Sequence, residues 1–124
     1  MNYYYGGFTA TLSDNDYFGI SCTGIGGDLN GDGVLDLVVG AYGDDDGASN
    51  AGSVYILFMQ TNGKVLSHQK VSATSGSLTA ALASKDYFGY SSAGVGGDLN
   101  GDGVLDLVVG AYGDDDGASN AGSV

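Results

Sequence analysis

Two identical loops carry oxygen-bearing side chains at alternate positions, and this spacing is typical of a site for a hard cation. In "DLNGDGVLD", residues 28–36, aspartate or asparagine stands at relative positions 1, 3, 5 and 9, with Gly33 at position 6. Ca²⁺ takes about six to eight oxygen ligands, and the carbonyl at position 7 would add one. We therefore expect two Ca²⁺ ions per chain. The predicted ligands are Asp28, Asn30, Asp32, Val34 and Asp36 in the first loop, and Asp98, Asn100, Asp102, Val104 and Asp106 in the second.

The residue at position 12 of each loop separates this pattern from the helix-flanked calcium loops. Those loops need an acidic ligand at position 12 and a helix after it. Here position 12 is Val39, or Val109 in the second loop, inside a β-branched run. The pattern therefore predicts a loop that closes a β-hairpin. A solvated hydrophilic turn is the alternative, and the exact recurrence of the loop makes it the weaker one.

A second acidic cluster, "GDDDG", places three aspartates in a row at 44–46 and again at 114–116. Three consecutive carboxylates converge on a cation less readily than alternating ones, so we predict a solvated turn rather than a metal site. Successive turns of an antiparallel meander alternate between its two ends. The Asp28 loop and the Asn62-Gly63 turn should therefore share one end, and the "GDDDG" turn should lie at the other. An acidic rim there would suit a cationic partner.

The elements that position these loops belong to a repeat of 70 residues. Residues 26–54 return without change at 96–124, and "DYFG" occurs at 16–19 and 86–89. Repeats of this length are typical of solenoids, propellers or arrays. Apolar runs separated by turn signals predict four strands in the first repeat, at 17–25, 35–42, 53–59 and 64–73. Residues 78–84 alone have helical propensity, over a segment too short to be stable.

The predicted fold is therefore all-β, with antiparallel four-stranded propeller blades and calcium-binding hairpin loops in an incomplete β-propeller. We expect residues 1–15 to end a preceding blade and 16–73 to form a complete one. Residues 74–85 would connect it to a partial blade at 86–124. The tyrosines at 3–5 are expected to form a strand edge rather than a sugar-binding platform. The expected partners of such blades are neighbouring blades of the same or another chain, because the chain reads as a fragment of a longer repeat protein or as a self-assembling piece.

Composition excludes several classes of function. All fifteen acidic residues are aspartate, and with three lysines and no arginine the net charge is -12. Nucleic acid is therefore not expected as a partner, because phosphate recognition needs clustered basic residues. No apolar stretch approaches the ~20 residues of a membrane span, and the first residues do not form a signal peptide. Cys22 is expected to be a small buried hydrophobe. His68 has no second histidine or nucleophile beside it in the sequence, so we expect no catalytic site and no enzyme.

The motifs together resemble the FG-GAP repeat of integrin α-subunit propellers. "DYFG" is followed by "GDLNGDGVLDLVVGAY" and "GSVYI", with Phe18-Gly19 at the FG and Gly40-Ala41 at the start of GAP. One departure is Tyr42, which stands where the family usually has proline. The resemblance implies a propeller of about seven blades, Ca²⁺ in hairpin loops on one face, and extracellular binding or adhesion through an unknown protein or carbohydrate ligand. A propeller region appended to a secreted hydrolase and a purely structural Ca²⁺-stiffened repeat are the alternatives.

Overall fold

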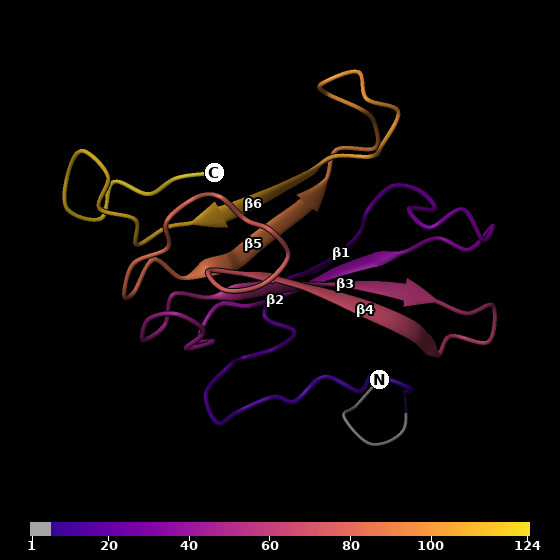
Figure 1. Ribbon diagram of the computed structural model, residues 1–124, viewed down its shortest axis with the longest axis horizontal. Helices are drawn as coiled ribbons and strands as arrows, with labels where there is room; N and C mark the ends of the chain where they lie inside the picture. Colours follow the sequence, from indigo (N-terminus) through magenta and orange to yellow (C-terminus); the bar gives the residue numbers. More distant parts are fainter. Residues whose placement is uncertain (1–5) are drawn as a thin grey trace.

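The computed structural model describes residues 6–124, which form six β-strands in two antiparallel sheets and no helix (Figure 1). The fold is therefore all-β, as predicted. The tyrosines at 3–5 lie outside the described residues. No helix within residues 6–124 has the length and apolar character needed to cross a membrane. The strands are β1 (Cys22–Gly24), β2 (Leu37–Ala41), β3 (Ser53–Met59), β4 (Val65–Ser72), β5 (Phe88–Gly94) and β6 (Leu107–Ala111).

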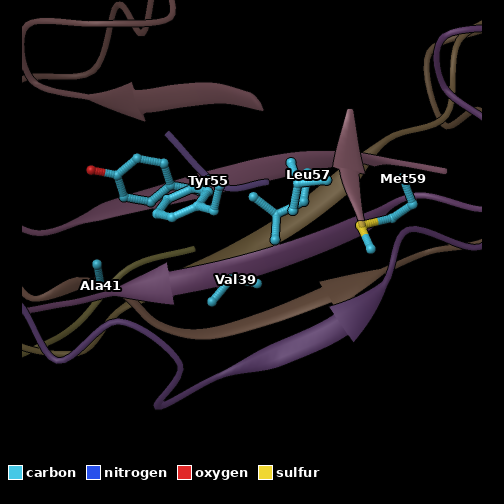
Figure 2. Close-up of a cluster of buried hydrophobic side chains, with 7 residues drawn as sticks. Val39, Ala41, Tyr55, Leu57 and Met59 are labelled. Atoms are coloured by element: carbon cyan, nitrogen blue, oxygen red, sulfur yellow. The ribbon is translucent and has the colours of Figure 1, made fainter. Parts of the chain in front are cut away.

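The first sheet is a four-stranded meander in the order β1-β2-β3-β4. Alternate residues of a strand point to opposite faces, and both faces of β3 are apolar. One face places Tyr55, Leu57 and Met59 in a row beside Val39 and Ala41 of β2, as Figure 2 shows. This cluster is covered by residues that precede the sheet. They are Phe8 with Ala10, Leu12 and Phe18.

The second sheet, β5-β6, packs against the other face of the first sheet. Val38 and Val54 contact Phe88, Leu107 and Val109 in a shared apolar cluster. Both faces of the first sheet are therefore covered, one by the 8–18 segment and one by the second repeat. This arrangement explains the near-continuous apolar run in β3, which a sheet exposed to water on one side would not have.

Two motif glycines permit the close approach of the two repeats. A Cβ on Gly40, from the first "GAY", would clash with the carbonyl oxygen of Gly89, from the second "YFG". Gly89 itself has φ +89° and lies against the carbonyl oxygen of Ser53. Only glycine combines this backbone conformation with this space. Gly40 of the first GAP motif and Gly89 of the second FG motif therefore form one of the close contacts between the two sheets.

The turns alternate between the two ends of the sheets, as predicted. The β1–β2 loop, the β3–β4 turn and the β5–β6 loop lie at one end (Figure 1). The β2–β3 connection, which contains the first "GDDDG", lies at the other end, with the segment after β6. The two Asp-rich loops therefore share an end that is opposite the two "GDDDG" loops.

Two expectations from the sequence are wrong. The first strand begins at Cys22 rather than at residue 17, because Tyr17 (φ 54°) and Gly19 (φ 99°) adopt left-handed turn conformations. Cys22 is exposed, not buried, because β1 is the edge strand of its sheet. By contrast, residues 78–84 form no helix, as expected for a segment too short to be a stable helix alone.

Candidate metal centre and the opposite acidic loop

The carboxylate of Asp28 organises the first loop through hydrogen bonds from the backbone. The N–H groups of Gly31, Asp32 and Gly33 donate to it at 2.6, 3.1 and 2.5 Å. Gly31 and Gly33 have φ of 78° and 83°, which favour glycine. These bonds, that from Gly33 above all, hold the pKa of Asp28 below its usual value. The loop thus forms a tight turn around a carboxylate that stays ionised.

Asp36 ends the loop and anchors it to the sheet. Its side chain is fully buried. The backbone N–H of Leu29 donates to Oδ2 at 2.8 Å, and the N–H of Met59 donates to Oδ1 at 3.1 Å. Asp36 therefore joins the start of the loop to the end of β3, across a sequence separation of 23 residues. The sequence singled out Asp36 only as a ligand, and this second role was not predicted.

The second loop repeats the turn but not the anchor. Asp98 accepts N–H bonds from Gly101, Asp102 and Gly103, and the bond from Gly103 is the largest cause of its lowered pKa. Asp106 accepts the N–H of Leu99, but it is only partly buried. The sequence identity of the two loops thus gives the same turn in both, whereas the contact to a third strand is present only in the first.

The remaining predicted ligands lie in the same turn. Asn30 Nδ2 donates to Asp32 Oδ2 at 3.2 Å, and the N–H of Val34 donates to Asp32 Oδ1 at 2.9 Å. Across residues 6–124, no three histidine, cysteine or acidic side chains are grouped closely enough to hold a metal. The atoms that could bind a metal in these loops are nonetheless all oxygens, and they lie in an exposed glycine turn with room around it. This donor set fits a hard cation, whose binding would require the carboxylates to move closer together.

At the opposite end, the first "GDDDG" loop is held by a lysine of β4. Lys70 Nζ lies 2.7 Å from Asp44 Oδ2 and 2.7 Å from Asp46 Oδ2. Asp44 is 4% exposed and also accepts the Ser53 hydroxyl at 2.7 Å. The prediction of a solvated turn is therefore wrong for Asp44, although Asp45 is exposed. A solvated turn would not bury a carboxylate, and this one is buried because it is paired.

The charges around Lys70 shift each other's titration. Burial disfavours the charged amine, but the bonds to Asp44 and Asp46 outweigh it and raise the pKa of Lys70. The same bond is the main cause of the lowered pKa of Asp46. Burial raises the pKa of Asp16 nearby. These residues line a polar cavity of about 430 Å³. Its lining is Thr11, Ser13, Asp16, Asp44, Asp45, Asp46 and Lys70.

Replacing Lys70 by glutamine is expected to lower the free energy of unfolding at pH 7 by about 2 kcal/mol, below the range for a fully buried pair because Asp46 is partly exposed. The folded-state pKa of Asp46 is lowered, so its contribution is present above the unfolded value of 3.8 and is lost as pH falls through the folded value. The folded-state pKa of Lys70 is raised, so its contribution to the free energy of unfolding is fully present at every pH below the unfolded pKa of 10.5. Urea unfolding from pH 7 to pH 2 should show the difference between wild type and variant shrinking below about pH 4. Lys64→Gln, at an exposed position, is the control; an equal loss from it would contradict the role of Lys70.

Five tyrosines form a continuous ring cluster across the two repeats, a feature that the sequence did not reveal. Tyr17 stacks on Tyr42 and Tyr87 stacks on Tyr112, each pair with ring centroids 5.0 Å apart. Tyr90 contacts both Tyr42 and Tyr112 edge to face, at 5.2 and 4.6 Å. Tyr42 and Tyr112 occupy the position of the missing proline, so the departure from the family pattern adds aromatic contacts between sheets.

Comparison with known proteins agrees with this geometry. The family model described as FG-GAP repeat matches residues 23–57 and 88–124. The chain is 41% identical to human integrin alpha-X over 96 residues, 77% of this chain and 8% of that protein. It is 40% identical to human integrin alpha-11 over 111 residues, 86% of this chain and 9% of that protein. Human integrin alpha-E is 38% identical over 104 residues, 80% of this chain and 8% of that protein.

The chain thus spans less than a tenth of the length of these integrin alpha relatives. The matched segments contain β2 and β6, both Asp-rich loops and both "GDDDG" loops. They make up more than half of the chain, and Gly40 and Gly89, from the GAP and FG motifs, form a close contact between its two sheets. The chain therefore belongs to the FG-GAP repeat family, whose repeats are blades of β-propellers.

Proposed function

We propose that the chain is a Ca²⁺-binding FG-GAP module that serves extracellular binding or adhesion, and that it is a binding module rather than an enzyme. The observation that carries the calcium part is the shared turn of the two Asp-rich loops. In each, an ionised aspartate gathers three backbone N–H groups at a glycine turn. The similarity to integrin alpha subunits supports the adhesion part and a protein partner. An extracellular or cell-surface location is part of the same proposal.

The ten predicted ligands would hold one Ca²⁺ in each loop. A bound Ca²⁺ would supply positive charge that offsets the repulsion among three carboxylates. Two ions would change the formal charge from -12 to -8, because each adds +2. Asp36 is fixed by Leu29 and Met59 before any ion binds, whereas Asp106 accepts a hydrogen bond from Leu99 alone among the residues that the structure describes. The first loop therefore loses less conformational freedom on binding, and we expect it to be the tighter site.

Asp32→Ala is expected to remove calcium binding at the first loop and leave the second intact. Calorimetric titration of EGTA-treated protein should give two ions for wild type and one for the variant, with affinities in the range of extracellular modules, about 10⁻⁴–10⁻³ M. Asp45→Ala is the matched control, because Asp45 is also an exposed loop aspartate that accepts a backbone N–H, from Asn50. No heat of binding in wild type would refute the calcium proposal. Equal losses from both variants would show that the "GDDDG" turn is also a metal site and that its assignment as a turn without a metal is wrong.

A further inference from the structure

The five tyrosines of the cluster between the repeats make two kinds of ring contact. Tyr17 and Tyr42 stack with their ring planes 9° apart and their centroids at 5.0 Å. Tyr87 and Tyr112 form the same pair in the second repeat, at 6° and 5.0 Å. Tyr90 instead contacts Tyr42 and Tyr112 edge to face, with interplanar angles of 75° and 64°. Each repeat therefore holds one parallel pair of phenol rings.

Two short motifs of the repeat produce these pairs. The first ring of each pair belongs to "DYFG", where Tyr17 and Tyr87 have φ of 54° and 57°. The second ring belongs to "GAY", at the position where the family usually has proline. The glycine after it leaves room for the first ring, because a Cβ on Gly43 would lie 2.8 Å from the Tyr17 ring, and one on Gly113 would lie 2.9 Å from the Tyr87 ring. The pairs therefore belong to each repeat of this chain and are not part of the family pattern.

The rings of the cluster are open to small molecules in solution. Tyr17, Tyr90 and Tyr112 are 52, 46 and 50% exposed. Tyr55 differs from them, because it is 1% exposed and its aromatic neighbours are phenylalanine and histidine rings. A soluble oxidant can therefore reach the phenols of the cluster, whereas the fold shields Tyr55.

The parallel arrangement of the rings suits one reaction of phenols. Loss of a hydrogen atom from a phenol leaves a radical whose unpaired electron is shared between the oxygen and the ring carbons ortho to it. The orbital that holds this electron stands perpendicular to the ring plane. Two such radicals therefore combine most readily when their rings are stacked and in contact, and combine poorly when the rings meet edge to face. Only the two stacked pairs have the favourable geometry among the ring contacts of this cluster.

We propose that Tyr17 with Tyr42, and Tyr87 with Tyr112, are sites of oxidative cross-linking to dityrosine by a peroxidase that uses hydrogen peroxide. For each link, two tyrosines and one hydrogen peroxide give one dityrosine and two waters. A C–C bond forms between two ortho carbons, the O–O bond of the peroxide breaks, and the two hydrogens that the tyrosines lose leave in the waters. The cluster lies at the end of the sheets opposite the Asp-rich loops, so the proposal is independent of calcium binding.

Each link would fasten a turn to the end of a strand. Tyr17 precedes β1, a strand of three residues at the edge of its sheet, and Tyr42 directly follows β2. A covalent bond between them closes the intervening loop in the unfolded chain as well, and so reduces the conformational freedom that folding must remove. The midpoint of urea unfolding should therefore rise after cross-linking.

Treatment of the full chain with a peroxidase and hydrogen peroxide tests the proposal. The tyrosines at 3–5 are replaced by phenylalanine in every sample, which leaves only the tyrosines of the cluster and Tyr55. Peptide mapping by mass spectrometry should find links 17–42 and 87–112, each lighter by two hydrogen atoms than the separate peptides. The fluorescence of dityrosine measures the yield, which should not depend on protein concentration, because both rings of a link belong to one chain.

Conservative variants and an unfolded sample provide the controls. Tyr42→Phe keeps a ring in the stack but removes its phenol, so it should abolish link 17–42 and leave link 87–112, and Tyr112→Phe should do the reverse. Oxidation of the chain unfolded in urea should spread the links over all tyrosines, Tyr55 included. The proposal is overturned if the folded chain forms no dityrosine, or if its links are mainly between chains. It is equally overturned if Tyr55 or Tyr90 is linked as often as the stacked partners are.

Discussion

Replacing Asp36 by alanine is expected to lower the free energy of unfolding by about 3 kcal/mol in the absence of calcium. Asp36 is fully buried, and its carboxylate accepts the N–H groups of Leu29 and Met59. Alanine leaves both donors without a partner, and a buried unpaired donor such as the Met59 N–H costs about 1–3 kcal/mol, whereas the partly buried Leu29 N–H costs less. Urea unfolding of EGTA-treated protein measures the loss. Added Ca²⁺ should stabilise wild type but stabilise this variant less, because the first loop has lost a ligand.

The chain supplies a matched control in the second loop. Asp106→Ala removes the same carboxylate from an identical loop, but there it is partly exposed and, within residues 6–124, accepts only the N–H of Leu99. We expect a loss of about 1 kcal/mol, because water can satisfy the single donor that is freed. Equal losses from the two variants would show that the Met59 contact contributes nothing and that Asp36 is only a loop residue.

The position of Asp36 connects the metal proposal to the fold. Its carboxylate is bonded both to the loop, at Leu29, and to the last residue of β3, at Met59. An ion that binds the first loop with Asp36 in this position binds only while the contact to the end of β3 is intact. Calcium binding at the first loop should therefore raise the stability of the whole sheet, whereas binding at the second should order mainly its own hairpin.

The sequence predicted the strands best where packing and turn chemistry agree. β3 was predicted at 53–59 and is observed there, because a run of large apolar residues lies between the "GDDDGASNAG" turn and Asn62-Gly63. The first strand was predicted five residues too long at its start. Tyr17 and Phe18 are aromatic and favour strands by propensity, but the left-handed conformation of Tyr17 turns the chain across the end of β2.

The opposite acidic loop was mispredicted because its partner is distant in the sequence. Lys70 follows Asp44 by 26 residues, and the counterpart of Asp44 in the second repeat has no lysine paired with it among the described residues. The repeat therefore gave no signal for the pair. One clue was available. "GDDDG" lies in the connection that leads into β3, at the end of the sheet where β4 finishes, and β4 contains one of only three lysines.

Tyr55→Ala is expected to be the most destabilising single substitution in the first sheet, at about 3–5 kcal/mol. The ring is 1% exposed and contacts Phe8 and Phe18 edge to face, each with a centroid distance of 5.5 Å. Lys70 Nζ, which pairs with Asp44 and Asp46, lies over the same ring at 5.6 Å from its centroid. Alanine would open a cavity beneath the covering 8–18 segment and remove the surface over which Lys70 passes. Thermal and urea unfolding measure the loss.

Two further variants separate burial from aromatic contact as such. Tyr55→Phe keeps the ring and should retain most of the stability, because the aromatic contacts to Phe8 and Phe18 remain. Tyr17→Ala removes a ring that stacks on Tyr42 at 5.0 Å but is 52% exposed, so we expect a loss below about 1 kcal/mol. If Tyr17→Ala and Tyr55→Ala were equally destabilising, the exposed tyrosine cluster between the repeats, and not the covered face of β3, would be the main support of the first sheet. We expect Tyr55→Ala to be the more destabilising of the two, because β3 is buried on both faces. Removing the Tyr55 ring leaves a cavity that neither water nor a neighbouring strand can fill, whereas removing the exposed Tyr17 ring does not.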